Sequence, residues 1–396
     1  MADKTQKIEE ALTRGVEKVL PSKEGLAKLM SQKKIRLYLG VDPTSPNLHL
    51  GHIIPLRKLQ QFADLGHEAI LLFGTFTAQI GDPSGRDERR KPLTPEEVEK
   101  NMADYKKQAS KVLDFSKVKV KRNGDWLSKF NFSDVAKLAS RITVPRLLER
   151  DMFQERMKKG QEVWLNEFLY PLMQGYDSVA MDVDLEIGGN DQTFNMLVGR
   201  DLQKSINKKE KFVLTTPMLV GLDGRKMSKT LGNTVNIADK PNEMYGKIMS
   251  LKDELIIPYF QICTDTESEE IAAMAKEMKA NKMNPRDAKA RLAGEIVKMY
   301  HGQQVAKAAA VEFDRVFKEK KLPQDISKIT VKEKEMPLID LLFKTKLASS
   351  KSEAKRLIIQ GAIKINDKPQ NDWQAVIAIK KGMVLKAGKR KFCQIS

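Results

Sequence analysis

Two short motifs carry side chains suited to binding a nucleoside triphosphate. The first, His49-Leu50-Gly51-His52, opens an expected helix just after an expected strand. A helix N-terminus presents unpaired N–H groups and the positive end of a dipole, so it attracts phosphate. The two imidazoles lie on one helix face, and Gly51 leaves room for a base or ribose to approach the backbone. This motif therefore indicates a nucleotide site.

The second motif, residues 224–230, reads GRKMSKT and follows an apolar stretch, residues 217–220, that we expect to be a strand. Lys226 and Lys229 flank Ser228 in this basic loop. The two ammonium groups could converge on the β- and γ-phosphates and neutralise the charge that develops as pyrophosphate leaves. The loop therefore indicates phosphate chemistry at the same site.

Each motif alone also has an ordinary explanation. The histidines could be surface or helix-capping residues, and the lysines could belong to a solvated basic loop. A zinc site formed by the two histidines is disfavoured, because no cysteine lies nearby and no third ligand is evident. The combination of the two motifs favours the nucleotide site.

Four polar clusters lie at the ends of expected strands or on a facing helix. They are Tyr38, residues 81–85, residues 170–177 and residues 188–192. In an open α/β sheet, ligands bind at the carboxyl ends of the strands. Within the third cluster, spacings of four and three place one polar set on a single helix face: Tyr170, Gln174 and Asp177. This face either binds a ligand or is a polar helix surface.

The order of these elements predicts an α/β fold. A strand at 35–41, a helix at 48–65 and a strand at 68–74 form a βαβ unit, which implies a parallel sheet with a right-handed crossover. We also expect a helix from Thr94 toward Phe115, a strand at 118–120, and helices over 133–207 around a strand at 183–187. The expected domains are a helical segment 1–33, a Rossmann-like parallel-sheet catalytic domain 34–240 with a helical insertion, an α-helical domain 241–323, a linker 324–336 and a small α+β module 337–396.

The charge of the chain indicates a polyanionic partner. The formal net charge is +18, and residues 330–396 contribute 15 Lys+Arg against 6 Asp+Glu, or +9. Nucleic acid is the first candidate for such a partner. The two cysteines, Cys263 and Cys393, have no CxxC spacing, and no apolar run approaches the roughly 20 residues that cross a bilayer. We therefore expect a cytoplasmic protein with no membrane partner.

The pair of nucleotide motifs resembles the two signatures of class I aminoacyl-tRNA synthetases. Nucleotidylyltransferases share the first motif and the sheet, and the KMSKT loop favours the synthetases over them. The resemblance implies that an amino-acid carboxylate attacks the α-phosphate of ATP, with Mg²⁺ accompanying the nucleotide and no protein-bound metal. His49, His52, Lys226 and Lys229 would stabilise charge in the transition state and would not act as nucleophiles.

The polar clusters resemble those of bacterial tyrosyl-tRNA synthetases over essentially the whole chain. The resemblance implies that Tyr38 and Asp177 bind the substrate phenol. It implies binding of the α-ammonium group by Asp82, Tyr170 and Gln174, of the carboxylate by Gln192, and a part in the pocket network for Asn123. It implies ATP contacts from Gly40, Asp42, Thr44, Gly189, Asp191 and Ser228. Arg86 and Arg90 stand where the family often has Lys and Arg, and the signature loop reads KMSKT where other members have KFGKT.

The C-terminal residues 337–396 resemble a small RNA-binding module of a ribosomal protein and of pseudouridine synthases. Its capped helix would present Lys351, Lys355 and Arg356 to phosphates. The alternative is a basic solubilising tail. The expected partners are therefore tRNA(Tyr), L-tyrosine and ATP, with a homodimer implied by the resemblance. A tryptophanyl synthetase is the rival enzyme, and an RNA-binding protein on an inactive scaffold is the non-enzymatic alternative.

Overall fold

The computed structural model describes residues 2–44, 47–82, 93–227, 231–319, 326–388 and 391–396. The chain packs as two compact units, one of residues 1–239 with 251–288 and one of residues 240–250 with 289–396. The expected helical domain 241–323 is thus divided between the two units. Within the described residues, none of the helices combines the length and the apolar character needed to span a lipid bilayer.

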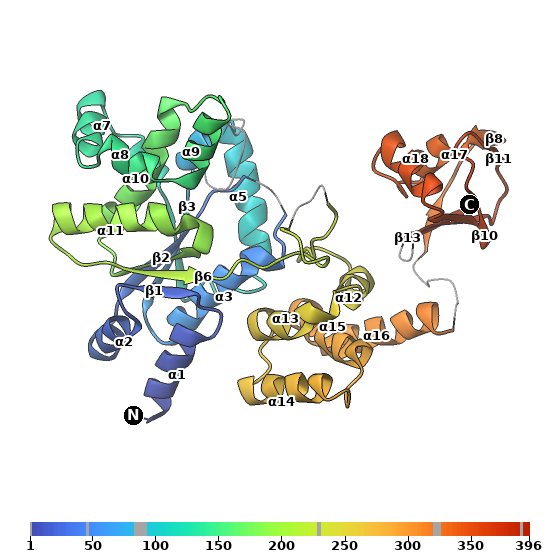
Figure 1. Cartoon of the computed structure of the whole chain (residues 1–396), viewed down its shortest axis with the longest axis horizontal. Coiled ribbons are helices and arrows are strands. Elements are labelled where there is room, and N and C mark those ends of the chain that lie inside the picture. The colour runs from blue at the N-terminus through green and yellow to red at the C-terminus, as the bar shows by residue number, and fades with distance from the viewer. Residues whose placement is uncertain (1, 45–46, 83–92, 228–230, 320–325, 389–390) are drawn as a thin grey trace. The chain divides into compact units, whose positions relative to one another are not determined.

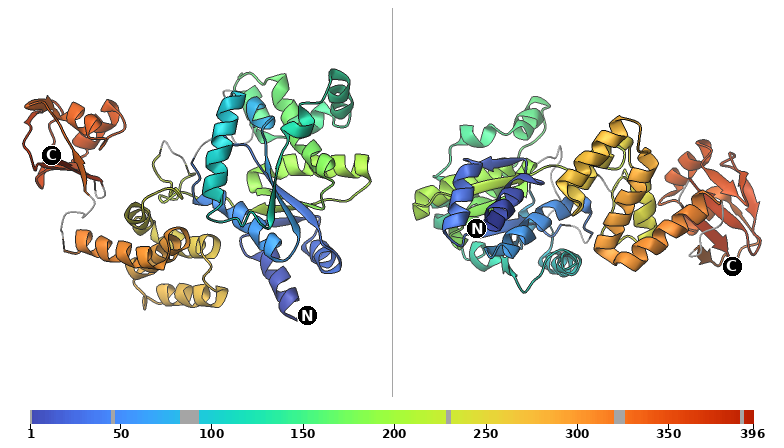
Figure 2. Two further views of the ribbon diagram at one scale, coloured as in Figure 1. Left: turned by 180° about the vertical axis from the view of Figure 1, so that it is seen from behind. Right: turned by 90° about the horizontal axis from the view of Figure 1, so that it is seen from below.

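A six-stranded sheet forms the centre of the first unit, with helices on both sides (Figures 1 and 2). Its strand order is β1-β6-β5-β2-β3-β4. The strands are β1 (Lys18–Leu20), β2 (Arg36–Val41), β3 (Glu68–Phe73), β4 (Val118–Arg122), β5 (Leu185–Gly189) and β6 (Phe212–Thr216). The pairs from β6 to β4 are parallel, and β1 joins β6 antiparallel at the edge. The α/β prediction with a parallel sheet is confirmed.

The direction of chain progression reverses at β2. From β2 the chain proceeds to β3 and β4 on one side, and it later returns to place β5 and β6 on the other side. Helix α3 (Leu50–Asp64) connects β2 to β3, and α11 (Thr193–Asn207) connects β5 to β6. Right-handed crossovers therefore place α3 and α11 on opposite faces of the sheet. The gap between the carboxyl ends of β2 and β5 is the switch point at which such sheets bind ligands.

Two expectations about strands are wrong in their details. The expected strand at 217–220 lies earlier in the chain as β6, and Val220 forms only an isolated bridge with Lys226. Pro217 lacks the N–H that would continue the sheet ladder, so the strand stops before it. The segment 1–33, expected to be helical, also contributes β1, whose last residue precedes Pro21 and is thereby biased toward extended backbone.

The remaining helices of the first unit pack on the sheet or on the helices that cover it. They are α1 (Ala2–Thr13), α2 (Lys23–Gln32), α4 (Thr77–Ile80), α5 (Pro95–Ala109), α6 (Gly124–Leu127), α7 (Phe132–Ala139), α8 (Val144–Leu148), α9 (Asp151–Lys158), α10 (Leu165–Met181), α13 (Ile256–Cys263) and α14 (Ser268–Lys279). Short 3₁₀ turns cover Asn190–Gln192 and Asp253–Leu255. The expected start of α5 is confirmed, since Thr94 and Glu97 form a capping box around Pro95.

Helices α10 and α11 cross closely because glycines face each other at the crossing. A methyl group on Gly175 would lie 3.1 Å from the backbone nitrogen of Gly199 and 2.9 Å from a methyl of Leu202. The backbone of Gly199 cannot yield as a flexible side chain could. This close approach sets the distance between α10 and α11, and α10 carries the polar face predicted from the sequence.

The second unit contains three long helices and a small C-terminal module. The helices are α12 (Pro241–Met249), α15 (Pro285–His301), most of which belongs to this unit, and α16 (Gln303–Phe317). The module consists of β7 (Ser327–Ile329), β8 (Glu335–Pro337), α17 (Leu338–Lys344), α18 (Lys351–Ile359), β9 (Ile363–Ile365), β10 (Lys368–Pro369), β11 (Val376–Ala378), β12 (Val384–Ala387) and β13 (Lys391–Ile395). Its helices and strands share one apolar core.

The expected linker 324–336 is partly structured. β7 pairs in parallel with β13, and β8 pairs antiparallel with β11, so the described residues from Ser327 onward belong to the module. Both strands are short, and their partners lie far away in the sequence. The polar composition of residues 324–336 therefore predicts a linker, because nothing in the local sequence indicates that β7 and β8 pair with distant strands.

We predict that Gly175→Ala lowers the free energy of unfolding by about 1–3 kcal/mol, because the added methyl group forces α10 and α11 apart. Urea unfolding followed by circular dichroism measures this change. The matched control is Gly294→Ala in α15, where an added methyl group meets no atom within 4 Å. The control should be neutral or stabilising by up to about 1 kcal/mol through helix propensity. Equal unfolding curves for wild type and Gly175→Ala would contradict the role of the crossing.

Candidate active site

A cavity of about 270 Å³ lies at the carboxyl ends of β2 and β5. Its wall combines residues from the end of β2, the first turn of α3, one face of α10 and the turn after β5. Predicted site residues that line the cavity are Gly40, Asp42, Thr44, His52, Asp82, Asn123, Tyr170, Gln174, Asp177 and Gln192. The structure thus brings together residues that lie up to 152 positions apart, from Gly40 to Gln192.

Asp42, the residue after the carboxyl end of β2, accepts hydrogen bonds from two hydroxyl groups. The Thr77 hydroxyl donates to Asp42 Oδ1 at 2.7 Å, and the Tyr170 hydroxyl donates to Oδ2 at 2.9 Å. Gly74, next to β3, leaves room for this carboxylate, since a methyl group there would lie 1.9 Å from Asp42 Oδ1. Burial and the nearby Asp42 and Asp82 carboxylates raise the pKa of Tyr170, so its hydroxyl stays protonated and donates.

Asp177 is buried in the cavity wall with one donor on each carboxylate oxygen. The Trp126 indole N–H donates to Oδ1 at 2.8 Å, and the Asn123 amide donates to Oδ2 at 3.3 Å. The same Asn123 amide nitrogen donates to Thr77 Oγ1 at 3.0 Å. Burial raises the pKa of Asp177 well above its usual range, and the two hydrogen bonds oppose this shift. Thr77 and Asn123 therefore connect Asp177 to Asp42.

A chain of amides runs along the opposite wall. The Asn195 amide on α11 donates to Gln174 Oε1 at 3.0 Å and to Gln192 Oε1 at 2.9 Å. The Gln192 amide in turn donates to Asp82 Oδ2 at 2.7 Å. Asn195 is fully buried and was not predicted from the sequence. These contacts fix which way the amides of Gln174 and Gln192 point.

Tyr38 lies in the core beside the cavity and is not among the residues that line it. Its hydroxyl is 3.0 Å from Ser178 Oγ. Burial, together with the carboxylates of Glu186 and Asp177, raises the pKa of Tyr38. The Tyr38 hydroxyl thus lies near enough to the predicted phenol-binding carboxylate of Asp177 for that charge to act on it, while it hydrogen-bonds to Ser178.

The two histidines of the first motif stack at the start of α3. Their ring centroids are 3.7 Å apart, and the His49 backbone N–H donates to His52 Nδ1 at 3.3 Å. His49 is the N-cap residue of α3. A methyl group on Gly51 would lie 3.1 Å from the His49 ring and 3.5 Å from Met227 Sδ. The start of the KMSKT loop therefore reaches the first motif, as the combination of the two motifs requires.

The second motif is described only in its first part. Lys226 holds a bridge to Val220, and its carbonyl accepts from the Asn233 amide at 3.1 Å. Burial and the Asp82 carboxylate raise the pKa of Asp191, and the positive charge of Lys226 opposes this shift. Gly189 is the last residue of β5, and a methyl group on it would lie 2.6 Å from Oδ1 of Asp191 in the turn that follows. The predicted residues Ser228, Lys229, Arg86 and Arg90 lie outside the described residues.

Comparisons with known proteins match this site and fold. A family model described as class I tRNA synthetases (W and Y) matches residues 30–318, and a tyrosine–tRNA ligase SYY-like C-terminal domain matches residues 318–395. The tyrosine–tRNA ligase of Moorella thermoacetica is 46% identical over 97% of this chain and 94% of the relative. That of Thermotoga maritima is 46% identical over 97% of this chain and 96% of the relative. The chain belongs to the tyrosine–tRNA ligases of class I.

Solved structures of tyrosyl-tRNA synthetases share the fold. A C-terminally truncated mitochondrial enzyme of Aspergillus nidulans has a TM-score of 0.66 at 24% identity and covers 79% of this chain and 94% of its own. An Archaeoglobus fulgidus enzyme solved with L-tyrosine has a TM-score of 0.62 at 26% identity, over 78% of this chain and 100% of its own. The resemblance inferred from the sequence is confirmed, and the tyrosine–tRNA ligase family is favoured over the nucleotidylyltransferases and tryptophanyl synthetases.

Several residues of this synthetase cavity escape prediction from the sequence. They are Asn47, Thr77, Tyr105, Glu186 and Met196, together with Asn195 behind the wall. None of them belongs to one of the polar patterns from which the site was predicted. Among the described residues, no group of three or more His, Cys, Asp or Glu side chains is placed to hold a metal ion.

We predict that Thr77→Val lowers kcat/KM for ATP–pyrophosphate exchange by about tenfold or more, because two buried hydrogen bonds are lost at nearly constant volume. Without the Thr77 hydroxyl, Asp42 loses its donor on Oδ1 and the Asn123 amide loses an acceptor, so the hydrogen-bonded connection between Asp42 and Asp177 is broken. Steady-state exchange assays measure it, with thermal unfolding to verify the fold. Thr77→Ser keeps the hydroxyl and should retain near wild-type activity. Equal activity of the valine and serine variants would show that the hydroxyl is unnecessary.

Proposed function

We propose that this chain activates L-tyrosine with ATP to form tyrosyl-adenylate and pyrophosphate, and then transfers tyrosine to the 3′-terminal adenosine of tRNA(Tyr). The observation that carries the proposal is Asp177, a buried carboxylate in the cavity wall with one donor on each oxygen. A carboxylate held in this way accepts a phenol O–H. Family membership supports the reaction class.

The polar groups of the cavity suit the two ends of tyrosine. Asp177, with Tyr38 nearby, is our proposed phenol site, and phenylalanine would leave this buried carboxylate without its partner. Sites that hydrogen-bond a substrate hydroxyl reject the analogue lacking it strongly, and a tyrosyl enzyme is a known illustration. Asp82, Tyr170 and Gln174 suit the α-ammonium group, with Gln192 near the carboxylate.

The ATP site is proposed at the start of α3 and the turn after β5. There the tyrosine carboxylate oxygen attacks the α-phosphorus while the bond to the pyrophosphate oxygen breaks. His49, His52, Lys226 and Lys229 would stabilise the charge on the phosphates, and Arg86 would assist pyrophosphate departure. Gly40, Asp42, Thr44, Gly189, Asp191 and Ser228 are the remaining proposed ATP contacts. Mg²⁺ would accompany the ATP phosphates.

A homodimer is proposed through the helical insertion of the first unit. Large apolar side chains are exposed on consecutive helices of this insertion, including Phe132 on α7, Val144 on α8 and Leu165 on α10, which are 89%, 63% and 76% exposed. Exposed apolar side chains gathered on neighbouring elements favour a protein interface. A second copy would cover them in a symmetric pair.

The tRNA is proposed to contact the C-terminal module and the helices of residues 241–323. In the module, Lys355 lies 3.7 Å from the centre of the Trp373 ring, and Lys351 forms an ion pair with Asp340 at 2.7 Å. Arg356 is exposed on the same helix, α18. Such a helix contacts phosphates without reading bases. Because aminoacylated tRNA is used in translation, the proposed place of action is the cytoplasm.

We predict that Asp177→Ala lowers kcat/KM for tyrosine in pyrophosphate exchange by roughly 10–100-fold, the cost of one hydrogen bond to a charged group. The ratio of tyrosine to phenylalanine activation should fall with it. Each amino acid is supplied singly in the assay. Asp201→Ala, at an exposed acid on α11, is the matched control and should leave activity unchanged. Exchange driven by tryptophan and not by tyrosine would overturn the proposed function.

We predict that Lys355→Glu with Arg356→Glu raises KM for tRNA by about tenfold or more, because two phosphate contacts become repulsive. Pyrophosphate exchange, which needs no tRNA, should stay at the wild-type rate. The same charge change at Lys380 and Lys381, exposed residues of the same module, separates a contact made by α18 from an effect of net charge. Loss of exchange in the α18 variant would contradict the division of labour.

A further inference from the structure

A buried ion pair lies behind the cavity, between neighbouring strands. Lys211, next to β6, and Glu186, in β5, are 0% and 1% exposed. The Lys211 ammonium contacts Glu186 Oε2 and donates to Ser178 Oγ at 2.8 Å. Glu186 itself lines the cavity. We propose that Glu186 and Lys211 are a positioning pair that holds Gln174 and Tyr38 in place for recognition of the amino acid, an inference that rests on the proposed function.

Glu186 determines the orientation of the Gln174 amide. The Gln174 nitrogen donates to Glu186 Oε1 at 3.1 Å, and the Gln174 oxygen accepts from the Asn195 amide at 3.0 Å. A flipped amide would place oxygen against the Glu186 carboxylate and nitrogen against the Asn195 amide nitrogen. Because both contacts would then be repulsive, only one orientation survives. In that orientation the Gln174 oxygen keeps a second lone pair for a substrate ammonium group.

Lys211 acts on Tyr38 through Ser178. An ammonium group only donates hydrogen bonds, so Ser178 Oγ must accept from Lys211. Ser178 Oγ also lies 3.0 Å from the Tyr38 hydroxyl, in a hydrogen bond that either hydroxyl can donate, and 3.4 Å from Glu186 Oε2, to which it can donate. Ser178 therefore links the Lys211 ammonium group to the Tyr38 hydroxyl. The pair thereby fixes the place of the Tyr38 hydroxyl.

The cost of burying these charges favours a functional role over a stabilising one. Replacing a buried ion pair by apolar residues of similar volume is often neutral or stabilising. Burial lowers the pKa of Lys211, and the Glu186 carboxylate opposes this shift. The helix crossing also accommodates the ammonium group, because a methyl on Gly199 would lie 2.6 Å from Lys211 Nζ. The core thus leaves space for the Lys211 ammonium group, although an apolar side chain of similar volume would pack there without a buried charge.

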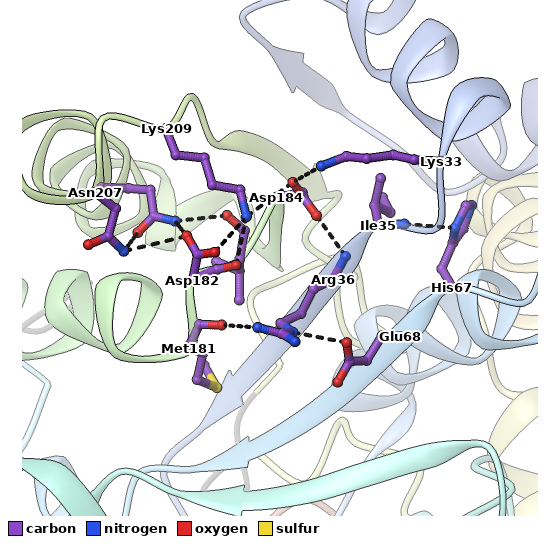
Figure 3. A network of polar contacts seen from close by, with 12 residues as sticks. Lys33, Ile35, Arg36, His67, Glu68, Met181, Asp182, Asp184, Asn207 and Lys209 are labelled. Carbon is purple, nitrogen blue, oxygen red and sulfur yellow. Dashed lines mark hydrogen bonds and ion pairs between the residues drawn. The ribbon is translucent and has the colours of Figure 1, made fainter.

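A second ion pair, whose two residues each lie two positions earlier in the sequence, provides the comparison. Asp184 contacts Lys209 at 3.3 Å and Lys33 at 2.8 Å, and it accepts from the Arg36 backbone N–H at 2.8 Å (Figure 3). Asp184 and Lys209 are not among the residues that line the cavity. This pair lies at the amino ends of the strands, whereas Glu186 lies toward the carboxyl ends. It has the same spacing in the sequence as Glu186 and Lys211, and among the described residues its side-chain hydrogen bonds and ion pairs run to Lys33, Arg36 and Asp182 instead of to the cavity wall.

Three double variants test the proposal in tyrosine-dependent pyrophosphate exchange with the full chain. Glu186→Leu with Lys211→Met removes both charges and the acceptor for Gln174. Glu186→Gln with Lys211→Met removes both charges and keeps an oxygen that can accept from Gln174. Asp184→Asn with Lys209→Met is the matched control. Thermal unfolding of each variant is recorded beside KM for tyrosine, KM for ATP and kcat.

The leucine variant should raise KM for tyrosine by about tenfold, with KM for ATP changed by less than about twofold, because a hydrogen bond to a charged group is lost on the amino-acid side alone. The glutamine variant keeps the acceptor for Gln174 and loses only the Lys211 contact, so it should raise KM for tyrosine by less than the leucine variant does. The control should stay within about threefold of wild type for both constants. Unchanged KM for tyrosine in the leucine variant overturns the proposal. A parallel rise in KM for ATP also overturns it, since it indicates general distortion of the site.

Ser178→Ala tests the connection to Tyr38 separately and does not depend on the folding of the double variants. It should lower the ratio of tyrosine to phenylalanine activation by about fivefold, because the Tyr38 hydroxyl loses its hydrogen bond to Ser178 and is held only by Glu186. An unchanged ratio overturns the role of Ser178. Wild-type exchange that tyrosine does not stimulate would instead overturn the proposed function. The effect of the pair is then measured with whichever amino acid does drive exchange.

Discussion

The structure depends on one constraint, which is that carboxylates removed from water require hydrogen-bond donors. Among the described residues, four acidic side chains line the cavity, namely Asp42, Asp82, Asp177 and Glu186. Hydroxyl groups hold Asp42, an indole and an amide hold Asp177, an amide holds Asp82, and a lysine with an amide holds Glu186. Most of these donors lie far from their carboxylates in the sequence, so the sheet and the helices around the cavity must fold before the carboxylates are satisfied. The fold and the site are therefore one energetic system.

The sheet topology explains why these donors can converge. At the switch point, the carboxyl ends of β2 and β5 adjoin, while α10 lies within reach because Gly175 lets it approach α11 closely. A helix held at the usual 8–10 Å or more from its neighbour would move the face of Gln174 and Asp177 away from the strands. The glycines at the crossing thus affect the site indirectly, because they set how closely α10 packs against α11. The positive end of α3 completes the site from the other side of β2.

The sequence predicts the parts of this system that repeat a local or familiar pattern. The strands β2 and β3, the capping box at Thr94 and the polar face of α10 follow from spacing, and the residues of the proposed tyrosine site follow from resemblance. Lys211 and Glu186 leave no such pattern, because they meet only through the pairing of two parallel strands. The roles of Thr77 and Asn195 likewise cannot be predicted from the sequence, because their hydrogen-bond partners become known only once the fold is known. The strands β1 and β7 are too short to show alternation, and each is recognisable only through its distant partner.

The same donors that satisfy the free protein also prepare it for substrate. A carboxylate has about four lone-pair positions, two on each oxygen. Trp126 and Asn123 each occupy one position on a different oxygen of Asp177, so each oxygen keeps one lone pair for the phenol that we propose binds there. In this proposal the phenol binds without breaking either hydrogen bond. A substrate ring without a hydroxyl group would bury this carboxylate further and donate no hydrogen bond to it. The proposed discrimination against phenylalanine therefore rests on hydrogen bonds that are already present in the free site.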